Sequence, residues 1–147
     1  MKPARRCLFP ILLFALCLIA GAPGPGMAQP DGCKVHLLTG EEYFYALKDA
    51  IDGARNSITI AIYLFKTNRF KTNRATAIQN ALLRAMRRGV DVTVIFERSD
   101  NREDFINGEN EKTGRRLQAA GAHVFWDRPD RKLPVKAVVI DQQLVFM

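Results

Sequence analysis

The first clear periodic pattern of apolar and polar residues starts near residue 39. Thr39 and Glu42 have the spacing of a capping box, in which a hydroxyl and a carboxylate bond to free amides at the start of a helix. The segment that follows has apolar residues at helical spacing, with charged residues between them. These apolar positions are Phe44, Leu47, Ala50, Ile51 and Ala54. Asn56 and Ser57 then predict the end of this helix, and the apolar run Ile58–Phe65 predicts a strand that is covered on both faces.

A second helix and strand follow the same order. The apolar positions of residues 75–88 again repeat at helical spacing, and Gly89 is suited to a left-handed helix cap. Residues 90–96 alternate and then become continuously apolar, which predicts another strand. A strand, a helix and a strand in this order predict parallel pairing with a right-handed crossover, and therefore an α/β fold.

The remaining pattern predicts shorter elements. Residues 35–38 are expected to form an edge strand, and residues 97–110 a long polar loop. A third helix is expected at 111–120, weakened by Gly114 and capped by Gly121. Strands are expected at 122–126 and 136–140, joined by a loop at 127–133, and a turn at 141–143 leads to a returning strand at 144–147.

The first 28 residues have the organisation of a secretory signal peptide. A positive start at Lys2, Arg5 and Arg6 precedes the apolar segment 8–20, and a Pro/Gly-rich stretch ends in small residues at Ala28. The alternative is an uncleaved membrane anchor, but the apolar segment is shorter than the roughly 20 residues of a membrane span. We therefore expect a secreted or periplasmic protein with no stable membrane anchor after cleavage.

The predicted mature domain is 29–147. The whole chain has 147 residues, 48% of them hydrophobic and 25% charged, which suits a globular domain. Removal of the signal peptide takes away three positive charges, so the formal net charge falls from +7 to +4. It also removes two cysteines and leaves Cys33 alone, so no internal disulfide is expected.

A five-residue sequence is repeated in tandem after the first predicted strand. Residues 65–69 and 70–74 are both Phe-Lys-Thr-Asn-Arg. The duplication produces a loop with four positive side chains beside an aromatic ring. The candidates for phosphate binding are Lys66, Arg69, Lys71 and Arg74, with Arg131 from the later loop. One interpretation is a phosphate or nucleic-acid contact with Phe70 as a base-stacking residue, and the other is a solvated loop.

The strand predicted at 136–140 carries the most informative polar residues. Lys136 comes two positions after Pro134, and Asp141 follows the four apolar residues 137–140. A lysine and a carboxylate at the ends of a buried strand are expected to face a cleft or each other. One alternative is a simple bridge between the strand ends.

This stretch resembles the H-x-K-x-x-x-x-D signature of the phospholipase D superfamily, with Pro134 at the histidine position. Other segments resemble the family in the same order. They are the helix ending at Arg55, the strand 57–65, and the segments 87–92, 121–124 and 136–146. The resemblance implies an α/β fold with a mixed sheet flanked by helices. It also implies a domain that is incomplete at its C-terminus, since the family continues into a Gly-Ser-x-Asn stretch and a further helix.

The resemblance implies a phosphodiesterase that needs no metal or other cofactor. In the family one histidine attacks the phosphorus to form a phosphohistidine, and a second histidine protonates the leaving oxygen. By position, Lys136 corresponds to the lysine that binds the phosphate oxygens, and Asp141 to the supporting carboxylate. Single-copy members dimerise so that two signatures meet, which makes a homodimer possible here. The implied substrate is a phospholipid or a nucleic acid.

Pro134 changes the expected chemistry, because proline has no nucleophile and no backbone N–H. The sequence leaves three hypotheses open: an exported phosphodiesterase with impaired activity, a non-catalytic module that binds phosphate-bearing ligands through a basic cleft, and a fragment with no stable fold. His123 or His36 could replace the missing histidine only by fortunate geometry, and surface histidines are the default expectation. Cys33 and His36 form half of a metal-binding pattern with no convincing partner, and Trp126 is expected at the edge of the core.

Overall fold

The computed structural model describes residues 32–70 and 72–147. The predicted signal peptide at 1–28 and Lys71 lie outside the described residues. The chain divides into two units, Met1–Val35 and His36–Met147, and the fold described here is that of the second. No regular strand forms at 35–38, where the sequence predicts an edge strand, and the Val35 and Leu37 side chains are largely exposed.

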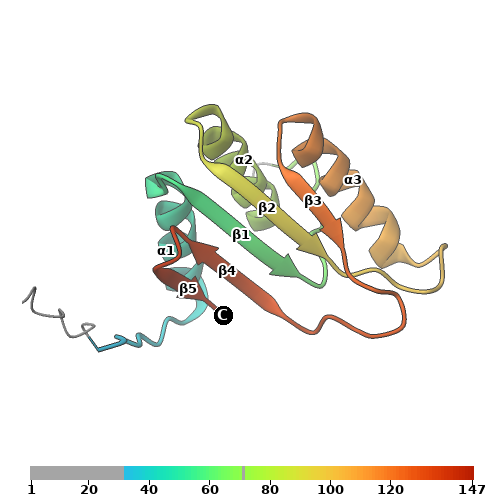
Figure 1. Cartoon of the computed structure of the whole chain (residues 1–147), viewed down its shortest axis with the longest axis horizontal. Helices are drawn as coiled ribbons and strands as arrows, with labels where there is room; N and C mark the ends of the chain where they lie inside the picture. Colours follow the sequence, from blue (N-terminus) through green and yellow to red (C-terminus); the bar gives the residue numbers. More distant parts are fainter. Residues whose placement is uncertain (1–31, 71) are drawn as a thin grey trace, which may run out of the picture. The chain divides into compact units, whose positions relative to one another are not determined.

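The described residues of the second unit form three helices and five strands (Figure 1). In chain order they are α1 (Gly40–Gly53), β1 (Ser57–Ile62), α2 (Arg74–Arg87), β2 (Asp91–Phe96), α3 (Phe105–Ala119), β3 (His123–Trp126), β4 (Lys136–Ile140) and β5 (Leu144–Phe146). The capping box at the start of α1 is present as predicted, and the backbone N–H of Thr39 donates to the Glu42 carboxylate.

The strands form one mixed sheet in the order β3-β2-β1-β4-β5. β1, β2 and β3 are parallel, whereas β4 is antiparallel to β1 and β5 is antiparallel to β4. The predicted α/β class, the parallel pairing of β1 with β2 and the returning strand at the C-terminus are all confirmed.

The described helices lie on one face of the sheet. Both crossovers, β1-α2-β2 and β2-α3-β3, move in the same direction across the sheet, and two right-handed crossovers of this kind place their helices on the same side. α1 packs against α2 (Figure 1). The core therefore forms between the helices and alternate residues of the strands, including Ile58, Ile60, Val92, Val94 and Phe96, each at most 2% exposed.

Two predicted boundaries are wrong, and both lie near the carboxyl end of the parallel strands. β1 ends at Ile62 and not at Phe65, because the chain leaves the sheet to enter the loop before α2. α3 begins at Phe105, within the segment predicted as a loop, and the Asp104 carboxylate accepts a hydrogen bond from the Ile106 N–H at this helix start.

Gly114 is a close-packing position within α3. A Cβ at this position would lie 3.2 Å from the Phe96 ring and 3.4 Å from the Val124 side chain. The absence of a side chain therefore allows α3 to pack closely on β2 and β3. The prediction that Gly114 weakens the helix describes its intrinsic propensity but not this packing role.

Candidate functional site

Lys136 is the first residue of β4 and pairs with Ile62, the last residue of β1. This end of β4 therefore lies on the side of the sheet where the three parallel strands end, which we call the carboxyl edge. In open α/β sheets, ligands commonly bind at this edge, because the loops that follow the strands converge there. Lys136 is exposed, and its ammonium group takes part in no ion pair among the described residues.

Asp141 lies on the opposite side of the sheet, where the parallel strands begin. It follows the end of β4 beside Ser57, the first residue of β1, so the five-residue strand separates it from Lys136 by roughly 17 Å. The Asp141 carboxylate accepts hydrogen bonds from the backbone N–H groups of Arg55, Asn56 and Ser57, at 3.0, 2.7 and 2.9 Å. The structure thus does not bring the two polar residues of the signature together.

Asp141 lies in the turn between β4 and β5. Its carboxylate stabilises a second turn, the one between α1 and β1. Asp141 and Gln142 both have positive φ angles, of 51° and 58°, as expected for the central residues of a tight hairpin turn. The backbone N–H of Gln143 closes this turn by donating to the Ile140 carbonyl oxygen. Hydrogen bonds from the Ser57, Arg55 and Asn56 amides hold the pKa of Asp141 below its usual value of 3.8.

Substitution of Asp141 by asparagine is expected to lower stability at pH 7 and to have a smaller effect near pH 3. The folded-state pKa of Asp141 is lower than its unfolded-state pKa, so its ionised form stabilises the fold above about pH 4. This contribution is lost as the pH falls through the folded-state pKa. Urea unfolding at both pH values measures the difference, and Asp49→Asn, at a side chain that is 78% exposed, is the control. An equal loss at both pH values would contradict the role of the ionised carboxylate.

Glu97 anchors the segment that leads into Lys136. It follows β2 directly, is only 3% exposed, and its carboxylate accepts a hydrogen bond from the backbone N–H of Leu133. Pro134, the next residue, is exposed in this loop. Sequence reasoning missed Glu97, and the available signal was an acidic residue placed immediately after a buried strand. A cavity of about 280 Å³ at this edge is lined by Tyr63, Glu97, Arg131 and Lys132 among others.

The inward face of α3 carries polar side chains that organise the loops at the same edge. Asn110 is fully buried: its Oδ1 accepts from the Phe65 N–H at 2.8 Å, and its Nδ2 donates to the Tyr63 carbonyl at 2.9 Å and the Glu97 carbonyl at 3.2 Å. Thr113 donates to the Phe65 carbonyl at 2.6 Å. Asn110 therefore ties the loop after β1 to the end of β2. Sequence reasoning did not identify this network.

The predicted phosphate-binding residues lie at several different places. Lys66 lies over the Phe105 ring at 4.7 Å, and Arg74 pairs with Glu41 at 2.9 Å. Arg131 pairs with Asp127 at 3.1 Å and lines the cavity beside Glu97. Arg69 lines a different cavity, on the helical face, and Lys71 lies outside the described residues.

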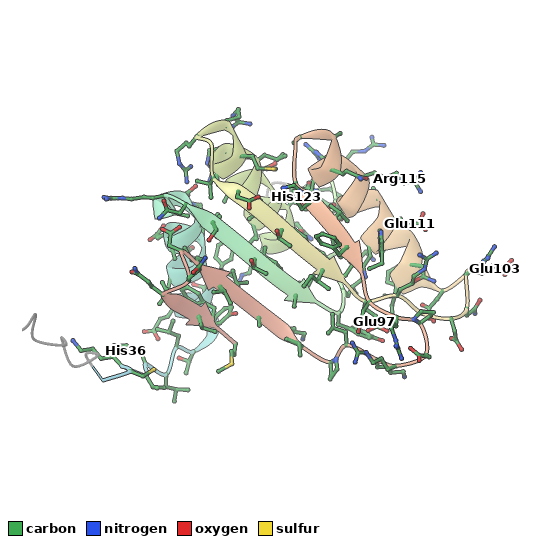
Figure 2. The ribbon with its side chains drawn as sticks, viewed as in Figure 1. His36, Glu97, Glu103, Glu111, Arg115 and His123 are labelled. Atoms are coloured by element: carbon green, nitrogen blue, oxygen red, sulfur yellow. The ribbon has the colours of Figure 1, made fainter. Side chains whose placement is uncertain are left out.

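Neither His36 nor His123 lies where it could replace the histidine that is missing at position 134. The Nε2 of His123 lies 3.3 Å from the Asp91 carboxylate, at the edge where β2 and β3 begin. Figure 2 shows His123 and Glu97 at opposite ends of the sheet. His36 is exposed on the segment before α1. Trp126 stacks on Phe96 with a centroid distance of 5.3 Å, which confirms its predicted place at the edge of the core.

The described residues contain no group of three or more His, Cys, Asp or Glu side chains that could hold a metal ion. Cys33 is exposed and forms no disulfide in the same part of the chain. No helix between residues 32 and 147, Lys71 aside, is both long and apolar enough to cross a membrane.

Comparison with known proteins agrees with the fold. The family model described as "Cardiolipin synthase, PLD-like domain" matches residues 47–147, so the chain belongs to this family of phospholipase D-like domains. Among solved structures, it is similar to the phospholipase D family member Nuc from Salmonella typhimurium, with a TM-score of 0.51 and 22% identity. This match covers 66% of the present chain and 56% of Nuc.

A second similar structure is NucT from Helicobacter pylori, with a TM-score of 0.53 and 18% identity. The match covers 71% of the present chain and 64% of NucT. The chain thus spans little more than half of Nuc and less than two thirds of NucT. No curated protein matches the chain. The family is of the phosphodiesterase type, and the two structural neighbours support the fold.

Proposed function

We propose that this chain is an exported phospholipase D-like phosphodiesterase domain in which Lys136 binds the phosphate and Pro134 impairs turnover. The observation that carries the proposal is the position of Lys136. It is an exposed ammonium group at the carboxyl edge of the parallel strands, in a member of this family. An ammonium group there neutralises phosphate oxygens. The substrate is a phosphodiester of a phospholipid or a nucleic acid.

Export is part of the proposal because residues 1–28 have the order of a signal peptide. A homodimer would bring two copies of the signature strand together. It would not supply a histidine at the signature position, since each copy carries Pro134. Turnover by the natural chain is therefore expected at the background rate, even where binding occurs.

The alternative is a non-catalytic domain that binds phosphate-bearing ligands. Pro134 favours it, because proline cannot attack phosphorus, and the exposed Lys136 suits binding without cleavage. The two functions share the phosphate site and predict the same low turnover for the natural chain. They differ in whether a histidine at position 134 restores cleavage, which makes the Pro134 position the decisive one.

Substitution of Lys136 by methionine is expected to weaken the binding of a simple phosphodiester about tenfold, since one charge-assisted contact is lost. Titration with bis(4-nitrophenyl) phosphate, followed by amide chemical shifts, measures both the affinity and the residues affected. Lys112→Met on α3 removes the same charge from another exposed position and serves as the control. Equal affinities of the two variants would rule out Lys136 as the phosphate ligand.

A further inference from the structure

A second basic site lies on the helical face of the domain. A cavity of about 430 Å³ is lined by residues of all three helices and of the loop between β1 and α2. Its cationic side chains are Lys48 of α1, Arg69 of the loop, Arg84 of α2 and Arg116 of α3. We call this cavity the helical groove. No residue of β4, the strand that begins with Lys136, lines it.

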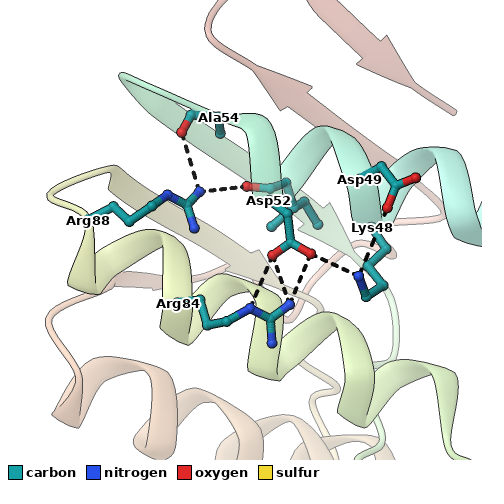
Figure 3. Close-up of polar contacts among 7 residues, drawn as sticks. Lys48, Asp49, Asp52, Ala54, Arg84 and Arg88 are labelled. Carbon is teal, nitrogen blue, oxygen red and sulfur yellow. Dashed lines mark hydrogen bonds and ion pairs between the residues drawn. The ribbon is translucent and has the colours of Figure 1, made fainter.

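The helical groove carries an excess of positive charge. Lys48 and Arg84 both contact the Asp52 carboxylate, at 2.9 and 2.8 Å, and these contacts hold the two cations in place (Figure 3). Burial alone would raise the pKa of Asp52, but hydrogen bonds from Lys48 and Arg84 lower it, so Asp52 is ionised at neutral pH. Arg69 and Arg116 take part in no ion pair among the described residues, so their charges remain available to an anion.

The loop that contributes Arg69 is held by hydrogen bonds. Thr76, in the first turn of α2, accepts from the Asn68 N–H and donates to the Asn68 carbonyl, each at 3.0 Å. The Asn68 side chain in turn accepts from the Phe70 N–H at 2.9 Å. The segment therefore presents Arg69 toward the groove from a defined turn, and the adjacent residue Phe70 is 71% exposed.

We propose that the helical groove binds single-stranded nucleic acid, with phosphates at Arg69 and Arg116 and a base stacked on Phe70. Non-sequence-specific single-strand sites combine cations along the backbone with exposed aromatic rings, and a single strand leaves its base faces free for stacking. A flat anionic membrane suits this face less well, since the acidic side chains Glu41, Asp49 and Asp52 of α1 lie on the same helical layer. The assignment is independent of Lys136 and of catalysis.

The test is fluorescence anisotropy of a labelled 20-nucleotide oligo-dT with the full chain over a range of salt concentrations. The double variant Arg69→Ala/Arg116→Ala is expected to bind about tenfold more weakly at low salt. Its slope of log affinity against log salt should fall by about 1.4, since each lost phosphate contact contributes about 0.7 for single strands. Phe70→Ala should also weaken binding about tenfold, but should leave the salt slope unchanged.

Lys112→Ala is the matched control, and it should bind the oligonucleotide as the natural chain does. Titration of the arginine double variant with bis(4-nitrophenyl) phosphate separates the two sites, because this small phosphodiester is expected at Lys136 and should bind with unchanged affinity. A failure of the helical groove would leave that second result intact. Unchanged oligonucleotide binding by the arginine double variant would overturn the proposal. The proposal would also be overturned if the arginine double variant lost binding to vesicles containing phosphatidylglycerol but still bound the oligonucleotide. That result would indicate a membrane contact. Thermal unfolding of each variant verifies that the fold is retained.

Discussion

Substitution of Asn110 by alanine is expected to lower the free energy of unfolding by about 3 kcal/mol, the range for a buried hydrogen-bond network that loses one member. Its side chain is fully buried and satisfies the Phe65 N–H and the carbonyl groups of Tyr63 and Glu97. Alanine would leave these backbone groups without their partner. It would also leave a small void under the loop after β1.

Urea unfolding at pH 7 measures the effect, and two further variants sharpen its interpretation. Gln118→Ala removes an exposed amide from the same helix and should change stability by less than about 0.5 kcal/mol. Asn110→Asp keeps the acceptor for Phe65 but places a carboxylate against two carbonyl oxygens, so it should be at least as harmful as alanine. A loss for Asn110→Ala no larger than that for Gln118→Ala would contradict the role of the network.

The elements with regular hydrophobic spacing were predictable from the sequence. The periodicity that predicts a helix at 75–88 matches α2, and the apolar runs on either side form the parallel strands β1 and β2. The start of α3 was predicted six residues too late, because its inward face includes Asn107 and Asn110. Such positions look like a loop when burial is inferred from hydrophobicity alone. Their partners are backbone groups of distant loops, which local sequence does not reveal.

The candidate site, like the fold, was only partly predictable from the sequence. The position of Lys136 at the start of a strand followed from the apolar run after it, and the pairing with β1 then places it at the carboxyl edge. A strand of five residues necessarily separates Lys136 from Asp141, so a bridge between them was excluded by strand geometry. The helical groove could not be predicted, because Lys48, Arg84 and Arg116 converge only through the packing of three helices.

Substitution of Pro134 by histidine is expected to raise the turnover of bis(4-nitrophenyl) phosphate about 100-fold above that of the natural chain, a typical gain from one positioned catalytic group. The new imidazole would attack phosphorus and expel 4-nitrophenolate, leaving a phosphohistidine, and water would then release the phosphate monoester. Pro134 is exposed in a loop held by the Glu97 contact to Leu133, so the larger side chain fits without loss of the fold.

The aryl substrate makes this test independent of the second histidine, because 4-nitrophenolate leaves without protonation. A burst of 4-nitrophenolate equal to the protein concentration, with an acid-labile phosphoryl group on the chain, would identify the intermediate. Pro134→Ala should stay at the background rate, which separates the gain of imidazole from the loss of proline. Addition of Lys136→Met to the histidine variant should remove most of the gain, since the developing charge on the phosphate oxygens would lose its cation. Background turnover by a folded Pro134→His protein would show that this edge of the sheet is not a phosphodiesterase site. Activity that depends on Lys136 would show that position 134 alone separates binding from cleavage.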